Sequence, residues 1–499
     1  MLFHDIFAHH PKEREAIIDQ DRSVTYGEFQ DLVERWAAYF EALGVKKGDR
    51  VGLVSKNCLE FIVTYFAVIK AGGVIVPINF QLVPREIAYI VKDTAMKLLV
   101  VKEALPLAEP LQELSAPSLM QITFDELHHA PEQEFVPVSL TETDPSTIIY
   151  TSGTTGKPKG AMLSHGNLYA NARDFMESIP LTAEDTALCV LPMYHCFAWT
   201  VCVAGPLLCG GRIVIQAVYQ FKAAMRLVKQ YGVTMFTGVP AVYRLLHESR
   251  DLDSVDSVRY FISGGAPLGL DLARGFALKF GRPVLEGYAL SEASPVVSVN
   301  LPHKVKVGSI GPTIAHVKAK IINAHGEEVP HFERGELLVK GPNVMLGYLN
   351  LPDATAKAIE KDGWLHTGDV GYMDEDGFIF LVDRVKDMII SSGENVYPRE
   401  IEEVVSAYPG VAECSVIGIP DALRGQAICL YVVPREGETI DKKALRQYLI
   451  GRIAPYKVPR EYFLVESLPK TALGKVRKNV LRDETVAILS KNKFAGRAL

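Results

Sequence analysis

Short apolar runs alternate with amphipathic segments through the first 300 residues, and this alternation constrains the fold more than any other feature. Residues 51–54 are predicted to form a buried strand, residues 60–70 a helix, and residues 74–77 the next strand. A helix between two strands at this spacing is typical of a parallel pair. Further strands are predicted at 98–101 and 147–150. The sequence therefore predicts an α/β fold in which helices cover a parallel sheet.

A second alternating series follows. Strands are predicted at 212–215, 235–236 and 260–262, with a helix over 222–231. This series indicates a second doubly wound sheet, and in such sheets ligands bind beyond the carboxyl ends of the strands. The loops expected at those ends are 151–160, 192–197, 237–240, 263–267 and 287–292.

The pattern changes near residue 305. Short strands separated by tight turns predict a β-rich subdomain over about 305–385. Residues 386–499 alternate helix and strand patterns, which predict a small α+β domain. We therefore expect a large N-terminal domain, residues 1–385, that holds two doubly wound sheets and the β-rich subdomain, followed by the C-terminal domain.

Composition excludes several classes of protein. A chain of 499 residues is longer than one hydrophobic core usually serves, and its net charge of −6 gives no electrostatic footprint for nucleic acid. The seven cysteines have apolar neighbours and no C-x₂-C pair, which favours reduced, buried thiols over a metal site. We expect a cytoplasmic enzyme, because the sequence has neither a signal-peptide pattern nor an apolar stretch of the ~20 residues that span a bilayer.

Residues 150–160, Tyr-Thr-Ser-Gly-Thr-Thr-Gly-Lys-Pro-Lys-Gly, combine four short hydroxyl side chains, three glycines and two lysines after a predicted strand. Glycines let backbone N–H groups turn toward an anion, hydroxyls donate hydrogen bonds, and lysines add positive charge. The loop is not a Walker A sequence, because Pro158 stands where that motif needs Ser or Thr. A solvated loop rich in Ser, Thr and Gly is the alternative, but the position after a buried strand favours polyphosphate binding.

Five more motifs follow this loop in order: Gly-Tyr-Ala-Leu-Ser-Glu at 287–292, Trp-Leu-His-Thr-Gly-Asp at 364–369, Asp-Arg-Val-Lys-Asp at 383–387, Gly-Glu-Asn-Val-Tyr-Pro-Arg-Glu at 393–400 and Pro-Lys-Thr-Ala-Leu-Gly-Lys at 469–475. With them the chain resembles the adenylate-forming enzymes, which include acyl- and aryl-CoA synthetases, peptide-synthetase adenylation domains and luciferases. It looks most like bacterial fatty acyl-CoA synthetases. In the family reaction a carboxylate attacks the α-phosphate of ATP, pyrophosphate leaves, and a thiol, usually that of coenzyme A, displaces AMP.

The resemblance implies a set of nucleotide contacts. The loop at 151–159 would hold the β- and γ-phosphates, Tyr288 would stack on adenine, and Asp369 would accept hydrogen bonds from the ribose hydroxyls. Arg384 would add ribose and phosphate contacts. The residues implied to bind ATP or AMP are Thr151, Ser152, Gly153, Thr154, Thr155, Gly156, Lys157, Lys159, Gly264, Gly265, Ala266, Glu286, Gly287, Tyr288, Ser291, Asp369, Arg384 and Lys475.

Catalysis and metal binding are implied for four residues. Lys475 would bridge the acid carboxylate and the α-phosphate. Glu292 would be a ligand of Mg²⁺, a hard cation that prefers oxygen, and Thr151 would join it. His195 would lie at the junction of acid and nucleotide and is included with the catalytic residues; a satisfied core histidine is the less favoured alternative.

The resemblance also implies an acid pocket, a coenzyme A channel and a hinge. Lys386 occupies the family's hinge position, so the resemblance implies a small mobile C-terminal domain that swings between the two half-reactions. Gly393, Glu394, Asn395 and Glu400 would face coenzyme A during thioester formation. The residues implied to line the acid pocket are His195, Phe197, Gly238, Val239, Gly265 and Gly287.

Two residues depart from the family pattern. Ala289 and Ser291 stand where relatives usually have Gly and Thr, and Ala289 with Leu290 makes this edge more apolar. We therefore expect an AMP-forming acyl-CoA synthetase that uses ATP, Mg²⁺ and coenzyme A to activate an apolar acid, with a medium- or long-chain fatty acid favoured. An aryl-acid CoA ligase shares every motif and stays open. An amino-acid adenylation enzyme is less favoured, because residues 192–199 lack an Asp to hold a substrate ammonium. The sequence also leaves open whether the chain forms a homodimer.

Overall fold

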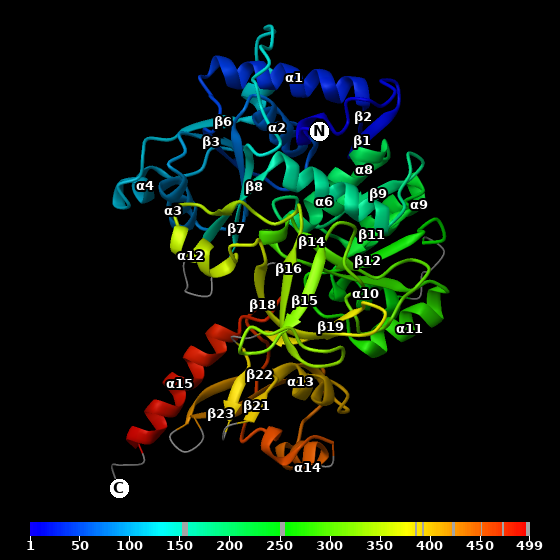
Figure 1. The fold of residues 1–499 in the computed structure, drawn as a ribbon, viewed down its shortest axis with the longest axis vertical. Helices are drawn as coiled ribbons and strands as arrows, with labels where there is room; N and C mark the ends of the chain where they lie inside the picture. Colours follow the sequence, from blue (N-terminus) through cyan, green and yellow to red (C-terminus); the bar gives the residue numbers. More distant parts are fainter. Residues whose placement is uncertain are drawn as a thin grey trace. The chain divides into compact units, whose positions relative to one another are not determined.

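The computed structural model describes residues 1–151, 158–249, 255–384, 387–391, 394–421, 425–450, 452–471 and 474–495, without the side chains of residues 394, 395, 425, 487 and 489–495 (Figure 1). The chain divides into two compact units, one comprising Met1–Ala319 and Leu338–His366 and the other Lys320–Leu337 and Thr367–Leu499. The α/β class is confirmed, because helices alternate with the strands of several mixed sheets. The domain boundary at residue 386 stays a prediction.

The larger sheet of the first unit has the strand order β14-β13-β12-β11-β9-β10-β1-β2. The six strands from β13 to β1 run parallel, and the edge strands β14 and β2 are antiparallel to their neighbours. The second predicted series is therefore a doubly wound sheet. Its strands are β1 (Glu15–Asp19), β2 (Arg22–Thr25), β9 (Thr186–Cys189), β10 (Arg212–Ile215), β11 (Met235–Gly238), β12 (Tyr260–Ser263), β13 (Val284–Ala289) and β14 (Val296–Val299).

Two strands of this sheet come from the N-terminus. Ile17 of β1 pairs with Ile213 of β10, and β2 closes the edge as an antiparallel hairpin partner of β1. The sequence predicts a helix over residues 12–45 after a short strand, but residues 15–19 and 22–25 form β1 and β2. This part of the prediction is wrong, because the strand partner of β1 lies far along the chain.

The sequence predicts Thr25 as the cap of the first helix, and the helix begins directly after it. The hydroxyl of Thr25 accepts a hydrogen bond from the Glu28 N–H at 3.2 Å, and the Glu28 carboxylate accepts one from the Thr25 N–H at 2.8 Å. This reciprocal pair satisfies two N–H groups that have no partner inside the helix. α1 (Tyr26–Ala42) ends before Gly44, whose φ of +88° suits a residue without a Cβ.

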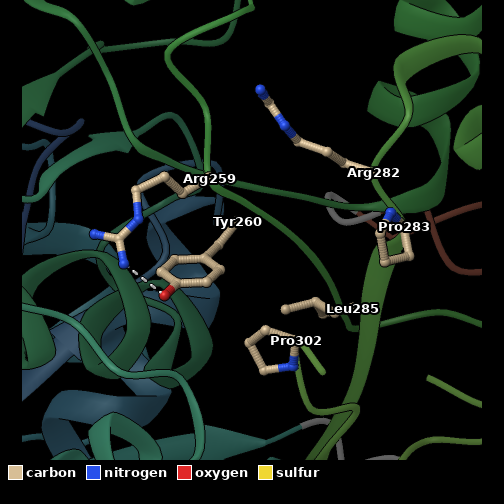
Figure 2. A pocket seen from close by; sticks show the side chains of 6 residues that line it. All are labelled: Arg259, Tyr260, Arg282, Pro283, Leu285 and Pro302. Carbon is tan, nitrogen blue, oxygen red and sulfur yellow. Dashed lines mark hydrogen bonds between the residues drawn. The ribbon is translucent and has the colours of Figure 1, made fainter. Parts of the chain in front are cut away.

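A cavity of about 360 Å³ lies beside the amino ends of β12 and β13 (Figure 2). Arg259 is already paired there, with Asp185 at 2.8 Å and with the Tyr260 hydroxyl at 2.8 Å. The loops predicted to bind ligands follow the carboxyl ends of the same strands, so this cavity is separate from them. Its lining residues are Arg259, Tyr260, Arg282, Pro283, Leu285 and Pro302.

The second sheet of the first unit has the order β17-β8-β7-β4-β3-β5-β6. The strands from β7 to β6 run parallel, as predicted, whereas β8 and β17 are antiparallel additions. Its strands are β3 (Arg50–Val54), β4 (Val74–Ile78), β5 (Leu98–Val101), β6 (Met120–Thr123), β7 (Pro145–Thr151), β8 (Lys159–Ser164) and β17 (Gly347–Tyr348).

Strand β8 was not predicted. Thr151 pairs with Lys159 and Tyr150 with Gly160, so the loop predicted to bind phosphate joins two antiparallel strands rather than leading directly into a helix. Gly160 is required at this position, because a Cβ there would lie 2.8 Å from Ile148 Cγ2. The strand pairing holds both ends of the loop side by side.

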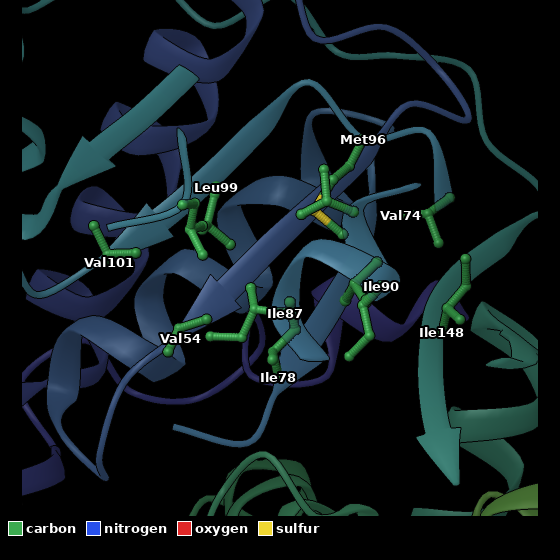
Figure 3. Packing of buried hydrophobic residues seen from close by; sticks show 12 residues of the cluster. Val54, Val74, Ile78, Ile87, Ile90, Met96, Leu99, Val101 and Ile148 are labelled. Carbon is green, nitrogen blue, oxygen red and sulfur yellow. The ribbon is translucent and has the colours of Figure 1, made fainter. Parts of the chain in front are cut away.

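The core of this sheet packs strand residues against one helix (Figure 3). Ile87 and Ile90 of α3 (Pro84–Thr94) are at most 3% exposed and face Ile78 of β4 and Leu99 of β5. Burial of one such side chain contributes roughly 1.5–3 kcal/mol. This packing fixes β4 and β7, and therefore the start of the phosphate loop.

Further helices surround the two sheets of the first unit. They are η1 (Phe3–Asp5), α2 (Leu59–Lys70), α4 (Ala108–Glu113), α5 (Phe124–His128), α6 (His165–Ser178), α7 (Cys196–Ala198), the π-helix η2 (Trp199–Ala204), α8 (Gly205–Cys209), α9 (Phe221–Tyr231), α10 (Pro240–Glu248), α11 (Leu270–Phe280), η3 (Ser291–Ala293) and α12 (Pro352–Ala358). In the described ranges, no helix combines the length and the apolarity that crossing a membrane requires.

A four-stranded sheet follows, with the order β15-β16-β18-β19. Its strands are β15 (Lys318–Ile322), β16 (Gly335–Lys340), β18 (Leu365–Met373) and β19 (Ile379–Arg384). β18 and β19 form an antiparallel hairpin in which Asp369 pairs with Arg384. Two motifs that are far apart in the sequence therefore lie on neighbouring strands.

The remainder of the second unit contains a five-stranded sheet with the order β21-β20-β23-β22, and β24 pairs with β23. The apolar faces of α13 and α14 pack on it through Ile401, Leu445 and Leu449, which are fully buried. The elements are β20 (Ile389–Ser391), β21 (Glu394–Val396), α13 (Pro398–Ser406), β22 (Val411–Asp421), β23 (Gly425–Pro434), α14 (Lys442–Ile450), η4 (Pro455–Lys457), β24 (Glu461–Leu464) and α15 (Lys478–Ala495).

Candidate active site

Glycine-rich loops meet at the carboxyl ends of β11 and β12. Gly238 pairs with Ser263, and the Gly264 N–H donates to the Gly238 carbonyl at 3.4 Å. Gly265 has a φ of +78°, and a Cβ at that position would lie 3.9 Å from Val239 Cγ1. The structure therefore brings together four residues that were predicted separately for the nucleotide and the acid.

The Phe197 ring lies directly against Gly264. A Cβ on Gly264 would approach Phe197 Cζ to 2.7 Å, which is closer than carbon atoms pack. Phe197 is 6% exposed and belongs to α7, the short helix that follows the loop 192–195. The absence of a side chain at residue 264 thus makes room for an aromatic wall predicted to belong to the acid pocket.

His195 is the N-cap of α7. Its Nδ1 accepts a hydrogen bond from the Phe197 N–H at 3.3 Å. Burial lowers the pKa of His195 to about 4, so the imidazole is neutral at pH 7. Because Nδ1 is the acceptor, the proton is on Nε2, which makes His195 an uncharged hydrogen-bond donor.

Cys196 connects α7 to η3. Its Sγ lies 3.4 Å from the Ser291 hydroxyl, and Ser291 precedes the predicted metal ligand Glu292. Burial raises the pKa of Cys196 to about 12, which excludes a thiolate nucleophile at neutral pH. This contact relates the position of His195 to that of Glu292, and no sequence pattern indicates it.

Glu292 is held by Tyr348, a residue that the sequence analysis missed. The Tyr348 hydroxyl donates to Glu292 Oε1 at 2.8 Å, and burial together with this carboxylate raises the pKa of Tyr348. Lys159 Nζ lies 5.1 Å from the centroid of the Tyr348 ring. Tyr348 pairs with Ala161 of β8, so the loop-end lysine and the carboxylate share one aromatic support.

The hydroxyl loop itself is only partly described. Thr151 ends β7, is half-buried and pairs with Lys159. The remaining predicted phosphate contacts, Ser152, Gly153, Thr154, Thr155, Gly156 and Lys157, lie outside the described residues.

The predicted nucleotide residues of β13 differ in environment. Glu286 is 6% exposed, and its Oε1 accepts a hydrogen bond from the Leu268 N–H at 2.9 Å. This contact anchors the loop that carries Gly264, Gly265 and half-buried Ala266. Gly287 and Tyr288 pair with β14 and are half-buried, and a Cβ on Gly287 would lie 3.0 Å from the Ser298 carbonyl oxygen. Direct nucleotide contact by these residues stays a prediction.

Asn57 fixes the loop that carries His195, and the sequence analysis missed it. Its Nδ2 donates to the carbonyls of Leu191 at 2.9 Å and Gln216 at 3.2 Å, and its Oδ1 accepts from the Met193 N–H at 2.8 Å. Asn57 is 4% exposed. One buried side chain therefore satisfies three backbone groups at the ends of β9 and β10.

In the second unit, the two predicted ribose-contacting residues form an ion pair. Arg384 Nε lies 3.1 Å from Asp369 Oδ1, and Asp369 is 5% exposed. The hairpin register of β18 and β19 places them opposite each other. A guanidinium orients the carboxylate, which suits Asp369 to accept hydrogen bonds from a diol.

Lys475 is presented by a hairpin formed by residues 469–471 and 474–477. The Thr471 N–H donates to the Lys475 carbonyl at 2.8 Å, and the Arg477 N–H donates to the Pro469 carbonyl at 2.8 Å. The Lys475 side chain is exposed. The backbone of this hairpin, called the Lys475 hairpin below, is therefore ordered by its own hydrogen bonds.

The predicted coenzyme A residues are partly described. Glu400 accepts hydrogen bonds from Arg334 and Lys457. Burial alone would raise the pKa of Glu400, but these two cations outweigh it and lower the pKa. Glu394 and Asn395 pair along the backbone with Ser391 and Ile390. Gly393 and the predicted hinge Lys386 lie outside the described residues.

Comparison with known families identifies the chain. Residues 3–349 match the family model described as AMP-binding enzyme, and residues 400–475 match the AMP-binding enzyme C-terminal domain. The chain belongs to the AMP-binding, adenylate-forming family. The resemblance drawn from the motifs is thereby confirmed.

Known members of the family are similar over nearly the whole chain. A feruloyl-CoA synthase from Amycolatopsis sp is 38% identical over 465 residues, which cover 92% of this chain and 94% of the relative. A long-chain-fatty-acid–CoA ligase from Bacillus subtilis strain 168 is 33% identical over 518 residues, with 95% and 92% covered. The crystal structure of ATP-bound MatB from Rhodopseudomonas palustris superposes with a TM-score of 0.91 at 32% identity, with 97% and 99% covered.

The chain is accordingly an acyl-CoA ligase of the adenylate-forming family. Adenylate-forming CoA ligases use ATP, Mg²⁺ and coenzyme A, which confirms the predicted co-substrates and ion at the level of the family. Because fatty-acid and feruloyl enzymes are both similar to it, the relatives do not determine which acid the ligase takes.

The ligase has a donor set that suits Mg²⁺. Glu292 is a half-buried carboxylate oriented by Tyr348, and Thr151 provides a hydroxyl at the end of β7. These are hard oxygen donors, which this ion prefers. The described residues also include Asp174, Glu177 and His316 close together, but Asp174 is already paired with Arg173 at 2.7 Å.

Proposed function

We propose that the ligase activates an apolar carboxylic acid, with a medium- or long-chain fatty acid as the class favoured by its sequence. The observation that carries this proposal is the wall formed by Phe197 on Gly264 beside neutral His195. An aromatic ring and an uncharged imidazole accept an apolar acid without burying an unpaired charge. The contact between Cys196 and Ser291 relates this wall to Glu292, where the phosphates would be held.

The first half-reaction brings two anions together. A carboxylate oxygen of the acid attacks the α-phosphorus of ATP, the bond from that phosphorus to the bridging oxygen of the β-phosphate breaks, and pyrophosphate leaves with the electron pair. We propose that Lys159 and the loop from Thr151 hold the departing phosphates and that Lys475 offsets the charge between carboxylate and α-phosphate. His195 donates from Nε2 and orients the acid without changing the net charge.

Other residues of the ligase would bind the metal ion, the ribose and coenzyme A. Glu292 and Thr151 would hold Mg²⁺, which neutralises phosphate charge when it is bound. Asp369, oriented by Arg384, would fix the ribose through its hydroxyls. Coenzyme A would then displace AMP by attack of its sulfur on the acyl carbonyl carbon, with Glu400 and the segment 393–395 near the thiol. We place the boundary between the two domains, and the hinge, at Lys386.

A compact aryl acid is the second candidate, and packing favours it. Val201 and Cys202 of η2, the helix that follows α7, are 0% exposed, and so are Cys189 of β9 and Thr237 of β11. A long alkyl chain that extended among these packed side chains would have to displace them. A planar ring of limited depth requires less rearrangement.

The test is pyrophosphate release with a panel of acids. Decanoate, palmitate, benzoate, ferulate and mixed amino acids are each supplied with ATP and Mg²⁺, with and without coenzyme A. We expect AMP and a thioester to form with an apolar acid only when coenzyme A is present. A preference for palmitate over benzoate and ferulate supports the fatty-acid class, and the reverse supports the aryl class. If no acid yields a thioester that depends on coenzyme A, the proposed function is wrong.

A further inference from the structure

The first two turns of α15 present two cations on one face, directly after the Lys475 hairpin. Lys478 begins the helix and Arg482 follows four residues later, so the two side chains project from the same side. Lys478 is the third residue after Lys475. Whatever fixes Lys478 therefore also limits where the Lys475 hairpin can lie within the second unit.

Lys478 is fixed by a carboxylate that is itself held in place. Its Nζ lies 2.9 Å from Glu402 Oε1, and the side chains are 18% and 21% exposed. The same Glu402 oxygen accepts the Val416 N–H at 2.7 Å. Burial alone would lower the pKa of Lys478, but the carboxylates of Glu402 and Asp383 outweigh it and raise the pKa. Because the pair is partly desolvated, it differs from a fully exposed surface ion pair, which contributes little to the free energy of unfolding.

Acidic residues before and after the proposed hinge face the same helix. Asp383 accepts hydrogen bonds from the Arg384 N–H at 2.7 Å and the Arg399 N–H at 2.9 Å, and its charge acts on Lys478. Arg482 Nη2 lies 2.7 Å from Asp387 Oδ1. The two cations of α15 thus interact with carboxylates on both sides of position 386.

We propose that Lys478 is a positioning residue for the adenylation half-reaction: its ion pair with Glu402 fixes the start of α15 and thereby the Lys475 hairpin. This inference rests on the proposed function of Lys475. The hairpin is ordered internally by its backbone bonds, but those bonds do not set its position relative to α13 and the hinge segment. Val476 of the hairpin packs against the buried cluster that includes Tyr431 and Leu481, and the Lys478–Glu402 pair adds a connection to α13, which carries Glu402.

The test compares the two half-reactions in Lys478→Met, which keeps the apolar stem and removes the charge. We expect the kcat of acyl-adenylate formation to fall about 10- to 100-fold, because a misplacement of about 1 Å has effects of that size. KM for ATP and for the acid should stay within about twofold, and thioester formation from supplied acyl-AMP should also stay within about twofold. Lys478→Arg should restore most of the adenylation rate.

Three further variants separate positioning from general stability. Glu402→Gln should reproduce the adenylation defect, and the Lys478→Met/Glu402→Gln double variant should be no worse than either single variant, because they remove one shared interaction. Lys470→Met is the matched control. Lys470 lies on the same hairpin and forms an ion pair with Glu413 of β22, and the two side chains are 38% and 43% exposed. Lys470→Met breaks this exposed pair. Its adenylation rate should be unchanged.

Amide hydrogen exchange gives a readout that does not depend on activity. Lys478→Met should exchange faster than the parent enzyme, by about tenfold, at residues 474–477 and at the same rate in β22 and β23. Unchanged exchange at 474–477, or equal losses in both half-reactions, would overturn the inference. If the parent enzyme activates no acid at all, the proposed function fails, and the exchange data alone decide whether Lys478 fixes the hairpin.

Discussion

Replacement of Asn57 offers a sharp test of how the His195 loop is held. Asn57→Ala would leave the carbonyls of Leu191 and Gln216 and the Met193 N–H without their present partner. Each unsatisfied buried group costs about 1 kcal/mol or more, so the free energy of unfolding should fall by about 3 kcal/mol. The loop 191–195 should loosen, and KM for the acid should rise about tenfold while KM for ATP stays within about twofold.

Asn57→Asp adds a pH-dependent signature. The carboxylate keeps the acceptor for the Met193 N–H but faces two carbonyl oxygens with no hydrogen to donate. Its pKa in the folded protein should therefore rise above the unfolded value of about 3.9. The penalty is present above the folded pKa and is relieved as the pH falls through it, because the protonated carboxyl can donate again. Relative to the parent, this variant should recover stability and acid affinity as the pH is lowered.

The assays are thermal denaturation across pH and pyrophosphate release against acid and ATP concentration. Asn323→Ala is a matched control, because Asn323 also makes three side-chain hydrogen bonds, but in an exposed turn. It should cost less than about 1 kcal/mol and leave both KM values unchanged. The reasoning would be refuted if Asn57→Ala were as mild as the control, or if KM rose equally for ATP and the acid.

Three further predictions concern separate parts of the enzyme. Lys475→Ala should lower the rate of acyl-adenylate formation by about 10³-fold, measured by pyrophosphate release, while thioester formation from supplied acyl-AMP falls less than tenfold; equal losses would exclude its assigned role. Gly264→Ala should force Phe197 aside, cost about 1–3 kcal/mol and raise KM for the acid, whereas Gly269→Ala, where nothing lies within 4 Å of the new Cβ, should do neither. An unchanged KM for the acid in Gly264→Ala would remove Phe197 from the acid pocket. Burial lowers the pKa of His4 to about 4 from the ordinary 6.5, so the unfolded chain binds the proton of His4 more tightly than the folded protein does. The free energy of unfolding should therefore fall by about 2 kcal/mol as the pH falls from 7 to 5. In His4→Phe the shift in Tm between these pH values should be smaller; an equal shift would show that His4 does not contribute.

Local pattern predicted the elements that depend on nearby residues. The cap at Thr25 and the strand at 98–101 agree with the sequence, because caps and apolar runs lie within a few residues of the feature they specify. The glycine loops after β11 and β12 were also placed correctly at the carboxyl ends of parallel strands. At these loops the glycine-rich sequence and the tendency of ligands to bind beyond the carboxyl ends of parallel strands indicate the same position.

Other features depend on partners that no local window contains. Residues 159–164 begin inside the predicted phosphate loop, and only their pairing with β7 shows them to be strand β8. Tyr348 and Asn57 were missed because their partners, Glu292 and the loop 191–193, lie far away in the chain. Sequence motifs therefore identify the reacting groups, whereas the side chains that orient those groups are recognised only from their contacts in the structure.

The pairing of β1 with β10 has a consequence for biosynthesis. Ile17 and Ile18 remain without their strand partners, Ile213 and Val214, until almost two hundred further residues have been made. At the usual rate of about 5–20 residues per second, the nascent chain exposes this apolar edge for on the order of ten seconds or longer. A fusion or truncation at the N-terminus would therefore disturb the pairing of β1 in the larger sheet. A ribosome-bound chain shorter than 215 residues should depend on chaperones, which keep the unpaired edge of β1 from pairing with another molecule.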